Sequence, residues 1–172
     1  MIDLRRMKNE TLAKLYSRSP FLVKKWADGA RVMEFSDSPW APLSREIPAC
    51  RLALVTTGGV HLHSQPPFDM SDPLGDPTFR EIPRETSPEG LTISHIYYDH
   101  SDADRDINVV FPLERAMALQ QAGDIKAVSS RHFSFMGHID GEHLNRLVHE
   151  TAPRVAASLK ADGADIVILT PA

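Results

Sequence analysis

The sequence has almost nothing that could cross-link the chain or anchor it in a bilayer. Cys50 is the single cysteine among 172 residues. It excludes an internal disulfide and fits a reducing compartment, so we expect a cytoplasmic protein. No apolar run approaches the roughly 18 residues of a membrane span, and the amino terminus lacks the apolar core of a secretory signal. We therefore expect no membrane partner.

An excess of positive charge is also missing. The chain has 19 Lys and Arg against 23 Asp and Glu, a net charge of -4, which gives no reason to expect nucleic acid as a partner. Neither nucleotide-binding fingerprint, GxGxxG or GxxxxGK[ST], occurs. These absences leave an enzyme domain or a binding domain for a small ligand.

What the sequence does contain is an alternation of short apolar runs and helical patterns. We expect strands at 51–57, 91–97, 125–129 and 164–170, and helices at 112–121, 140–149 and 151–160. This order predicts an α/β fold with a largely parallel sheet and flanking helices, a Rossmann-like three-layer arrangement. The stretch 61–88 is rich in Pro, Asp, Ser and Gly and is expected to be a long, functional loop.

The domain organisation follows from the same patterns. Residues 1–38 are expected to form a helical arm of two short helices, with Ser19 as a cap and Pro20 at the first position of the second helix. Residues 39–172 are expected to form the α/β domain.

The last residues, DIVILTPA, raise a question about the carboxyl end of this domain. The apolar run Ile166–Leu169 predicts a fully buried strand of a parallel sheet. The chain normally leaves such a strand into a loop that forms part of the ligand crevice. We expect the carboxyl ends of the strands to share one edge with Thr56–Gly59, the residues after Tyr97, residues 130–137 and the residues from Thr170 onward.

Three polar segments supply candidate site residues. In TTGGVHLH, the Gly58–Gly59 pair could present backbone N–H groups to an anion, with hydroxyls from Thr56 and Thr57, although a tight turn also explains it. The segment 94–108 is interpreted as a solvated loop, a metal site or a docking loop. Arg131 could hold a substrate carboxylate. Cys50 is expected to be a small buried residue.

Several stretches, taken together, resemble one family. They are TTGGVHLHSQPPFD, GDPTFREIP, SHIYYDHSDADRDINVVFPLERAMAL, and IKAVSSRHFSFMGHI followed by APRVAASLKADGADIVILTPA. In this order they resemble the selenoprotein B subunits of the glycine, sarcosine, betaine and D-proline reductases, most closely the D-proline type. The resemblance covers about Pro39 to Ala172.

The resemblance implies an activity and a set of partners. In that family the last strand is followed within a residue or two by selenocysteine or cysteine, so the expected nucleophile lies after Ala172, and the chain is expected to be an inactive upstream fragment. The implied reaction is reductive C–N bond cleavage of D-proline, glycine or a related amine. The implied partners are a pyruvoyl-containing subunit, a small amino-acid or carboxylate substrate, a dithiol reductant and a second copy in a homo-oligomer.

The resemblance also selects the residues expected to line the crevice: Thr56, Thr57, Gly58, Gly59, His61, Asp99, Asp104, Asn108, Arg131 and His132. No metal and no catalytic residue is assigned within the chain. Two alternatives remain open. One is a reductase-like homologue that acts on a different electrophile without a pyruvoyl partner, and the other is a non-catalytic module that binds a small carboxylate.

Overall fold

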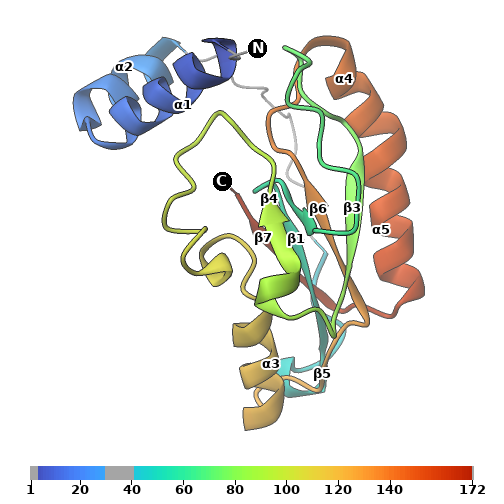
Figure 1. Ribbon diagram of the computed structural model, residues 1–172. Helices are drawn as coiled ribbons and strands as arrows, with labels where there is room; N and C mark the ends of the chain where they lie inside the picture. The colour runs from blue at the N-terminus through green and yellow to red at the C-terminus, as the bar shows by residue number, and fades with distance from the viewer. Residues whose placement is uncertain (1–3, 30–40, 172) are drawn as a thin grey trace. The chain divides into compact units, whose positions relative to one another are not determined.

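The computed structural model describes residues 4–29 and 41–171, which fall into two units (Figure 1). One unit holds the amino-terminal helices together with the short segment 96–99, and the other holds residues 44–95 and the chain from residue 100 onward.

The amino-terminal unit contains α1 (Leu4–Ser17) and α2 (Pro20–Gly29). The backbone N–H of Leu22 donates to the hydroxyl of Ser19 at 3.4 Å, and Pro20 is the first residue of α2. Both predicted short helices are therefore confirmed, whereas the expected boundary between residues 38 and 39 lies outside the described residues. No described helix is long and apolar enough to cross a membrane.

The second unit is built on a five-stranded sheet with β1 (Arg51–Thr56) at its centre. Its other strands are β3 (Phe79–Pro83), β5 (Ala127–Val128), β6 (Arg131–Phe135) and β7 (Ile166–Thr170). β5 and β6 pair with β1 in parallel, β7 also pairs with β1 in parallel, and β3 pairs with β6 antiparallel. The predicted α/β fold with a largely parallel sheet is confirmed.

Helices cover the sheet. They are α3 (Leu113–Ala122), α4 (Gly141–Arg146) and α5 (Ala152–Ala161), with short helical turns η1 (Ile47–Ala49), η2 (Pro88–Gly90) and η3 (Ile107–Val109). A π-helical turn, η4 (Leu147–Thr151), joins α4 to α5 without a break. The two helices predicted around Thr151 are thus one continuous segment, in which Pro153, the second residue of α5, directly follows the π-helical turn.

The core that fixes the sheet lies on the α5 face. Ala53 and Val55 of β1, Phe133 and Phe135 of β6, and Val155 and Leu159 of α5 form one buried cluster. Alternate residues of a strand face opposite sides of its sheet. The neighbours Leu52, Leu54 and Thr56 therefore face the opposite side and are also buried. Burial on both faces explains why RLALVT is an almost unbroken apolar run.

The stretch 61–88 is more ordered than its composition predicts. It contains β3 and most of β2 (Val60–Leu62), which pairs antiparallel with β4 (Leu91–Ile93) in a separate two-stranded ribbon. Arg80 organises the loop: its guanidinium donates to the carbonyls of Pro66 and Pro67 and lies 4.3 Å from the ring centre of Phe68. The prediction of one long strand at 91–97 in the main sheet is therefore wrong.

The last strand also differs from expectation. Among the described residues β7 pairs only with β1, so it is an edge strand. Val167, Ile168 and Leu169 are 38%, 37% and 70% exposed. The prediction that Ile166–Leu169 is fully buried is wrong, because β7 has a neighbour on one side only.

Candidate functional site

The parallel strands β1, β6 and β7 end at the same edge of the sheet, the upper edge in Figure 1. We call this the carboxyl edge and define it by Thr57–Gly59, Met136–His138 and Thr170. The backbone N–H of Thr57 donates to the carbonyl of Thr170 at 3.0 Å. On the other side of Thr57 lies Gly137, where a Cβ would come within 2.4 Å of the Thr57 carbonyl oxygen. Three strand ends therefore meet around Thr57, as the crossover rule predicted.

The glycine pair at this edge does not form an anion cradle. The N–H of Thr57 is bonded to Thr170, the N–H of Gly58 donates to the Thr56 hydroxyl at 3.0 Å, and the N–H of Gly59 donates to the Phe135 carbonyl at 2.9 Å. All three donors are engaged inside the protein. This arrangement favours the tight-turn alternative over the anion-binding interpretation of TTGG.

Close packing explains why glycine is needed there. Gly59 has φ +70°, and a Cβ at this position would lie 2.6 Å from the carbonyl oxygen of Ser94. Its own carbonyl accepts a hydrogen bond from the Ser94 N–H at 2.9 Å. The absence of a side chain thus lets the end of β4 approach the carboxyl edge, and with it His95.

His61 is held in one tautomer just beyond this turn. Its Nδ1 lies 2.9 Å from the carbonyl of Leu62, which can only accept, so Nδ1 carries the proton. Nε2 therefore accepts from the hydroxyl of Ser94 at 2.8 Å. Burial lowers the pKa of His61. The buried hydrogen bond between His61 and Ser94 thus joins β2 to the end of β4, next to the Gly59 turn.

His95 is the titratable group that the sequence analysis did not select. It is 5% exposed, and its pKa is lowered to about 4, first by burial and then by the charges of His138 and His100. A backbone hydrogen bond with Met136 opposes this shift. At neutral pH His95 is therefore an uncharged imidazole at the carboxyl edge, which can accept a proton. The signal in the sequence is that His95 and His138 each follow a strand closely.

Arg131 and His132 lie elsewhere. The sequence analysis ended a strand at Ser129, but β6 runs from Arg131 to Phe135, so both residues belong to its amino half. Arg131 donates to Asp162 at 2.6 Å and to Glu81 at 3.2 Å, contacts that raise its pKa. The expectation that these residues line the carboxyl edge is wrong.

His132 is a residue of the sheet interior. Its side chain is 0% exposed, and its Nδ1 accepts a hydrogen bond from the backbone N–H of Leu54 at 3.0 Å. Burial lowers its pKa to about 4.

The remaining predicted residues make local contacts. Asp104 accepts a hydrogen bond from His100, and Asn108 donates to Asp106 and, at 2.6 Å, to Glu114 at the start of α3. Asp99 lies in segment 96–99, which belongs to the other unit. Of the predicted set, the structure brings together Thr56, Thr57, Gly58, Gly59 and His61.

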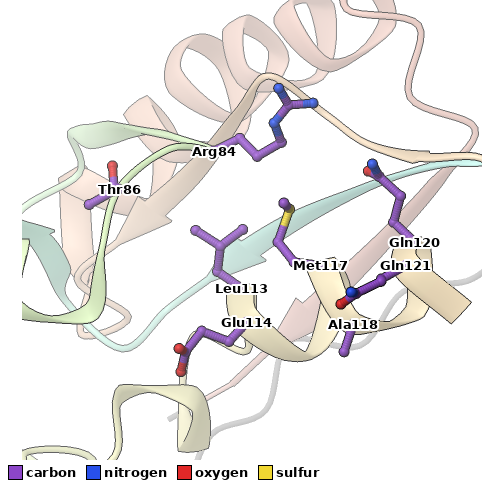
Figure 2. Close-up of a pocket in the computed structure, with 8 residues that line it drawn as sticks. All are labelled: Arg84, Thr86, Leu113, Glu114, Met117, Ala118, Gln120 and Gln121. Carbon is purple, nitrogen blue, oxygen red and sulfur yellow. The ribbon is translucent and has the colours of Figure 1, made fainter.

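A hollow of this unit lies at the opposite end of the sheet. Figure 2 shows Leu113 and Met117 of α3 along one side and Arg84 and Thr86 along the other. α3 neighbours β5, which pairs with the first residues of β1, so this groove is at the amino ends of the parallel strands. Ligands of such sheets bind at the carboxyl ends. Within the described ranges, no group of three or more His, Cys, Asp or Glu is placed to hold a metal ion.

An α/β unit with a largely parallel sheet is typical of small-molecule enzymes and binding proteins, and comparison with known proteins narrows this class. Residues 24–172 match the family described as glycine/sarcosine/betaine reductase selenoprotein B. The chain is also 37% identical over 131 residues to the D-proline reductase subunit gamma of Acetoanaerobium sticklandii. No solved structure matches.

The chain therefore belongs to the glycine/sarcosine/betaine reductase selenoprotein B family, and its similarity is to the D-proline type. The resemblance inferred from the sequence motifs is confirmed. The aligned segment is 76% of this chain and 52% of the relative. The chain thus spans about half the length of the curated relative that it matches.

Proposed function

We propose that the chain is the amino-terminal part of an amino-acid reductase component whose redox residue follows β7. The observation that carries the proposal is the position of Thr170. Its carbonyl is bonded to Thr57, and its hydroxyl donates to the carbonyl of Val110 at 2.7 Å. A selenocysteine or cysteine within a residue or two of Ala172 would lie close to the carboxyl edge, where parallel sheets bind their ligands.

The proposed reaction is reductive cleavage of a C–N bond in D-proline, glycine or a related amine. The selenolate or thiolate attacks the carbon attached to nitrogen, and the C–N electron pair leaves with nitrogen, which takes up a proton. A thiol then attacks the selenium or sulfur, and the released carbon is protonated. A dithiol reductant regenerates the nucleophile and is oxidised to a disulfide. A pyruvoyl group on a partner subunit would activate the substrate amine.

The described residues have two roles in this proposal. The turn Thr56–Gly59 fixes the end of β7 through the Thr57 and Thr56 contacts to Thr170. His95 contributes a buried, uncharged imidazole beside this edge that can hydrogen-bond the nucleophile or the substrate; its lowered pKa makes it too weak a base to deprotonate a thiol. Because the turn donates all three of its N–H groups internally, the substrate carboxylate must be bound by other groups.

The first test is to read the source DNA in frame beyond the codon for Ala172. We expect a UGA or cysteine codon within two codons, followed by a second cysteine and by further in-frame coding sequence. UGA is read as selenocysteine in such genes and as a stop otherwise. An ordinary stop codon with no continuing frame would contradict the proposal, and a module that binds small carboxylates would then be the better description.

The second test measures the reaction. The full-length subunit, mixed with a pyruvoyl-containing partner and dithiothreitol, should convert D-proline to its ring-opened amino acid, or act on glycine, sarcosine or betaine. His95→Gln keeps a neutral polar group of similar size but loses the imidazole, and should lower the rate by about tenfold, the effect of losing one hydrogen bond of about 1.4 kcal/mol. His149→Gln, an exposed position on η4, is the matched control. An unchanged rate for His95→Gln would remove His95 from the mechanism.

A further inference from the structure

Strand β7 presents apolar side chains to solvent on both of its faces. In its register with β1, Val167 pairs with Ala53 and Leu169 with Val55, whereas Ile168 pairs with Leu54 on the opposite face. Leu169 is 70% exposed, although its partner Val55 is buried. Sheet edges in soluble proteins usually carry charged residues, prolines or bulges that prevent further pairing. β7 has the composition of an interior strand.

The length of the relative indicates what covers this edge. The aligned segment is only 52% of the D-proline reductase subunit gamma, so nearly half of that protein has no counterpart in the described chain. A segment of that length is sufficient for several further strands and crossover helices.

We propose that β7 is an interior strand of the complete subunit. The occupant of its free side is the polypeptide that corresponds to the unmatched part of the relative, which adds a strand parallel to β7. This inference depends on the premise of the proposed function that the subunit is longer than the described chain. It adds where the rest of the subunit docks and which side chains it covers.

Handedness decides which face receives the next helix. The chain passes from β6 on one side of β1 to β7 on the other through α4 and α5, which lie on the face of Ala53 and Val55. Parallel crossovers in one sheet have the same, right-handed sense in about 98% of cases. A crossover that continues outward from β7 therefore lays its helix on the α5 face. The register places Val167 and Leu169 on that face, and Leu169 is its most exposed member.

The test compares the burial of Leu169 in the chain alone and in a fusion that continues into the unmatched part of the relative. Leu169→Cys is introduced into a Cys50→Ala background, and the rate of thiol alkylation is measured. The matched control is Val109→Cys in the same background, since Val109 is 60% exposed on η3. We expect the Leu169→Cys thiol to react at least roughly tenfold more slowly in the fusion, with no change for Val109→Cys.

Hydrogen exchange on the unsubstituted proteins gives a second readout. Peptides that cover 166–170 should exchange more slowly in the fusion than in the chain alone. Equal alkylation and exchange rates in both proteins would overturn the proposal, as would a fusion whose added part stays unfolded by circular dichroism. Protection of Leu169→Cys in the chain alone, together with a dimer in sedimentation, would assign the edge to a second copy instead. These readouts measure burial only, so they separate this proposal from a failure of reductase activity.

Discussion

His132 supplies a prediction about how stability depends on pH. Its Nδ1 accepts the backbone N–H of Leu54 at a gap in the ladder, because β1 pairs with β5 at residues 51–52 and with β6 at residues 55–56. The side chain replaces a carbonyl that β5 and β6 do not provide. Protonation would place an N–H against the N–H of Leu54, so the fold requires the neutral ring.

The sign of the effect follows from the two pKa values. The ordinary pKa is 6.5, and in the folded protein it is lowered to about 4. Between these values the unfolded chain binds more protons than the folded protein, so the free energy of unfolding falls as the pH falls. The slope is about 1.4 kcal/mol per pH unit for one group, and the loss between pH 7 and pH 4 is about 3 kcal/mol. His95 adds an effect of the same sign.

Two substitutions separate the proton from the hydrogen bond. In His132→Asn, Oδ1 can occupy the place of Nδ1 and accept from Leu54, so the pH slope should decrease by one proton while the acceptor is kept. His132→Ala leaves the Leu54 N–H without a partner and opens a cavity, which should cost about 3–5 kcal/mol at pH 7. Urea unfolding followed by circular dichroism, from pH 7 to pH 4.5, measures both.

His149→Asn, at an exposed position, controls for the loss of an imidazole. A His132→Asn variant that keeps the wild-type slope would refute the reasoning, as would stability that rises toward acid pH.

Three further substitutions test the contacts around the site. Gly59→Ala forces a side chain into positive φ and against the Ser94 carbonyl, and should lower the free energy of unfolding by about 2 kcal/mol or more; a loss below 0.5 kcal/mol in urea titration would contradict this. Arg80→Lys keeps the charge but loses the guanidinium hydrogen bonds to the carbonyls of Pro66 and Pro67 and the stacking on Phe68. It should speed hydrogen exchange in peptides from 64–72 at a stability cost of about 1–2 kcal/mol, and unchanged exchange would count against that role. Thr170→Val removes the hydroxyl that donates to Val110 and should cost about 1 kcal/mol in thermal unfolding, whereas an unchanged melting temperature would show that this contact is dispensable.

Local patterns in the sequence were sufficient for part of the fold. β1 is apolar throughout and bounded by a glycine pair, and α3 has Pro112 before it and Gly123 after it, so each element was predicted within one residue or so. β6 was missed because Ser129–Ser130 resembled the end of a strand. In the structure the chain resumes pairing after this interruption, and β1 and β3 support β6 from both sides. Such support comes from distant residues and leaves no local pattern.

The same limit applies to the site. A glycine pair after a strand suggests that the nearby backbone N–H groups are free to bind a ligand. The sequence does not show which partners these groups already have. Here one partner is Thr170, at the far end of the domain sequence. The polar composition of the segment 94–108, which contains His95, fits a solvated loop, a metal site or a docking loop. The actual environment of His95, buried beside Gly59 and near His138, is created by the contact between the end of β4 and the carboxyl edge.

The position of Cys50 bears on the proposed function, which requires a nucleophile at the carboxyl edge. Cys50 is the single cysteine of the sequence, is buried, and directly precedes Arg51, the first residue of β1. It therefore lies at the end of the central strand opposite to the carboxyl edge. Within the described residues, that edge combines a fixed turn and a neutral imidazole, His95, but no thiol. A histidine alone cannot supply the two electrons of the proposed reductive cleavage. Under the proposed function a selenolate or thiolate that follows β7 would supply them, because β7 ends at this edge with Thr170 bonded to Thr57.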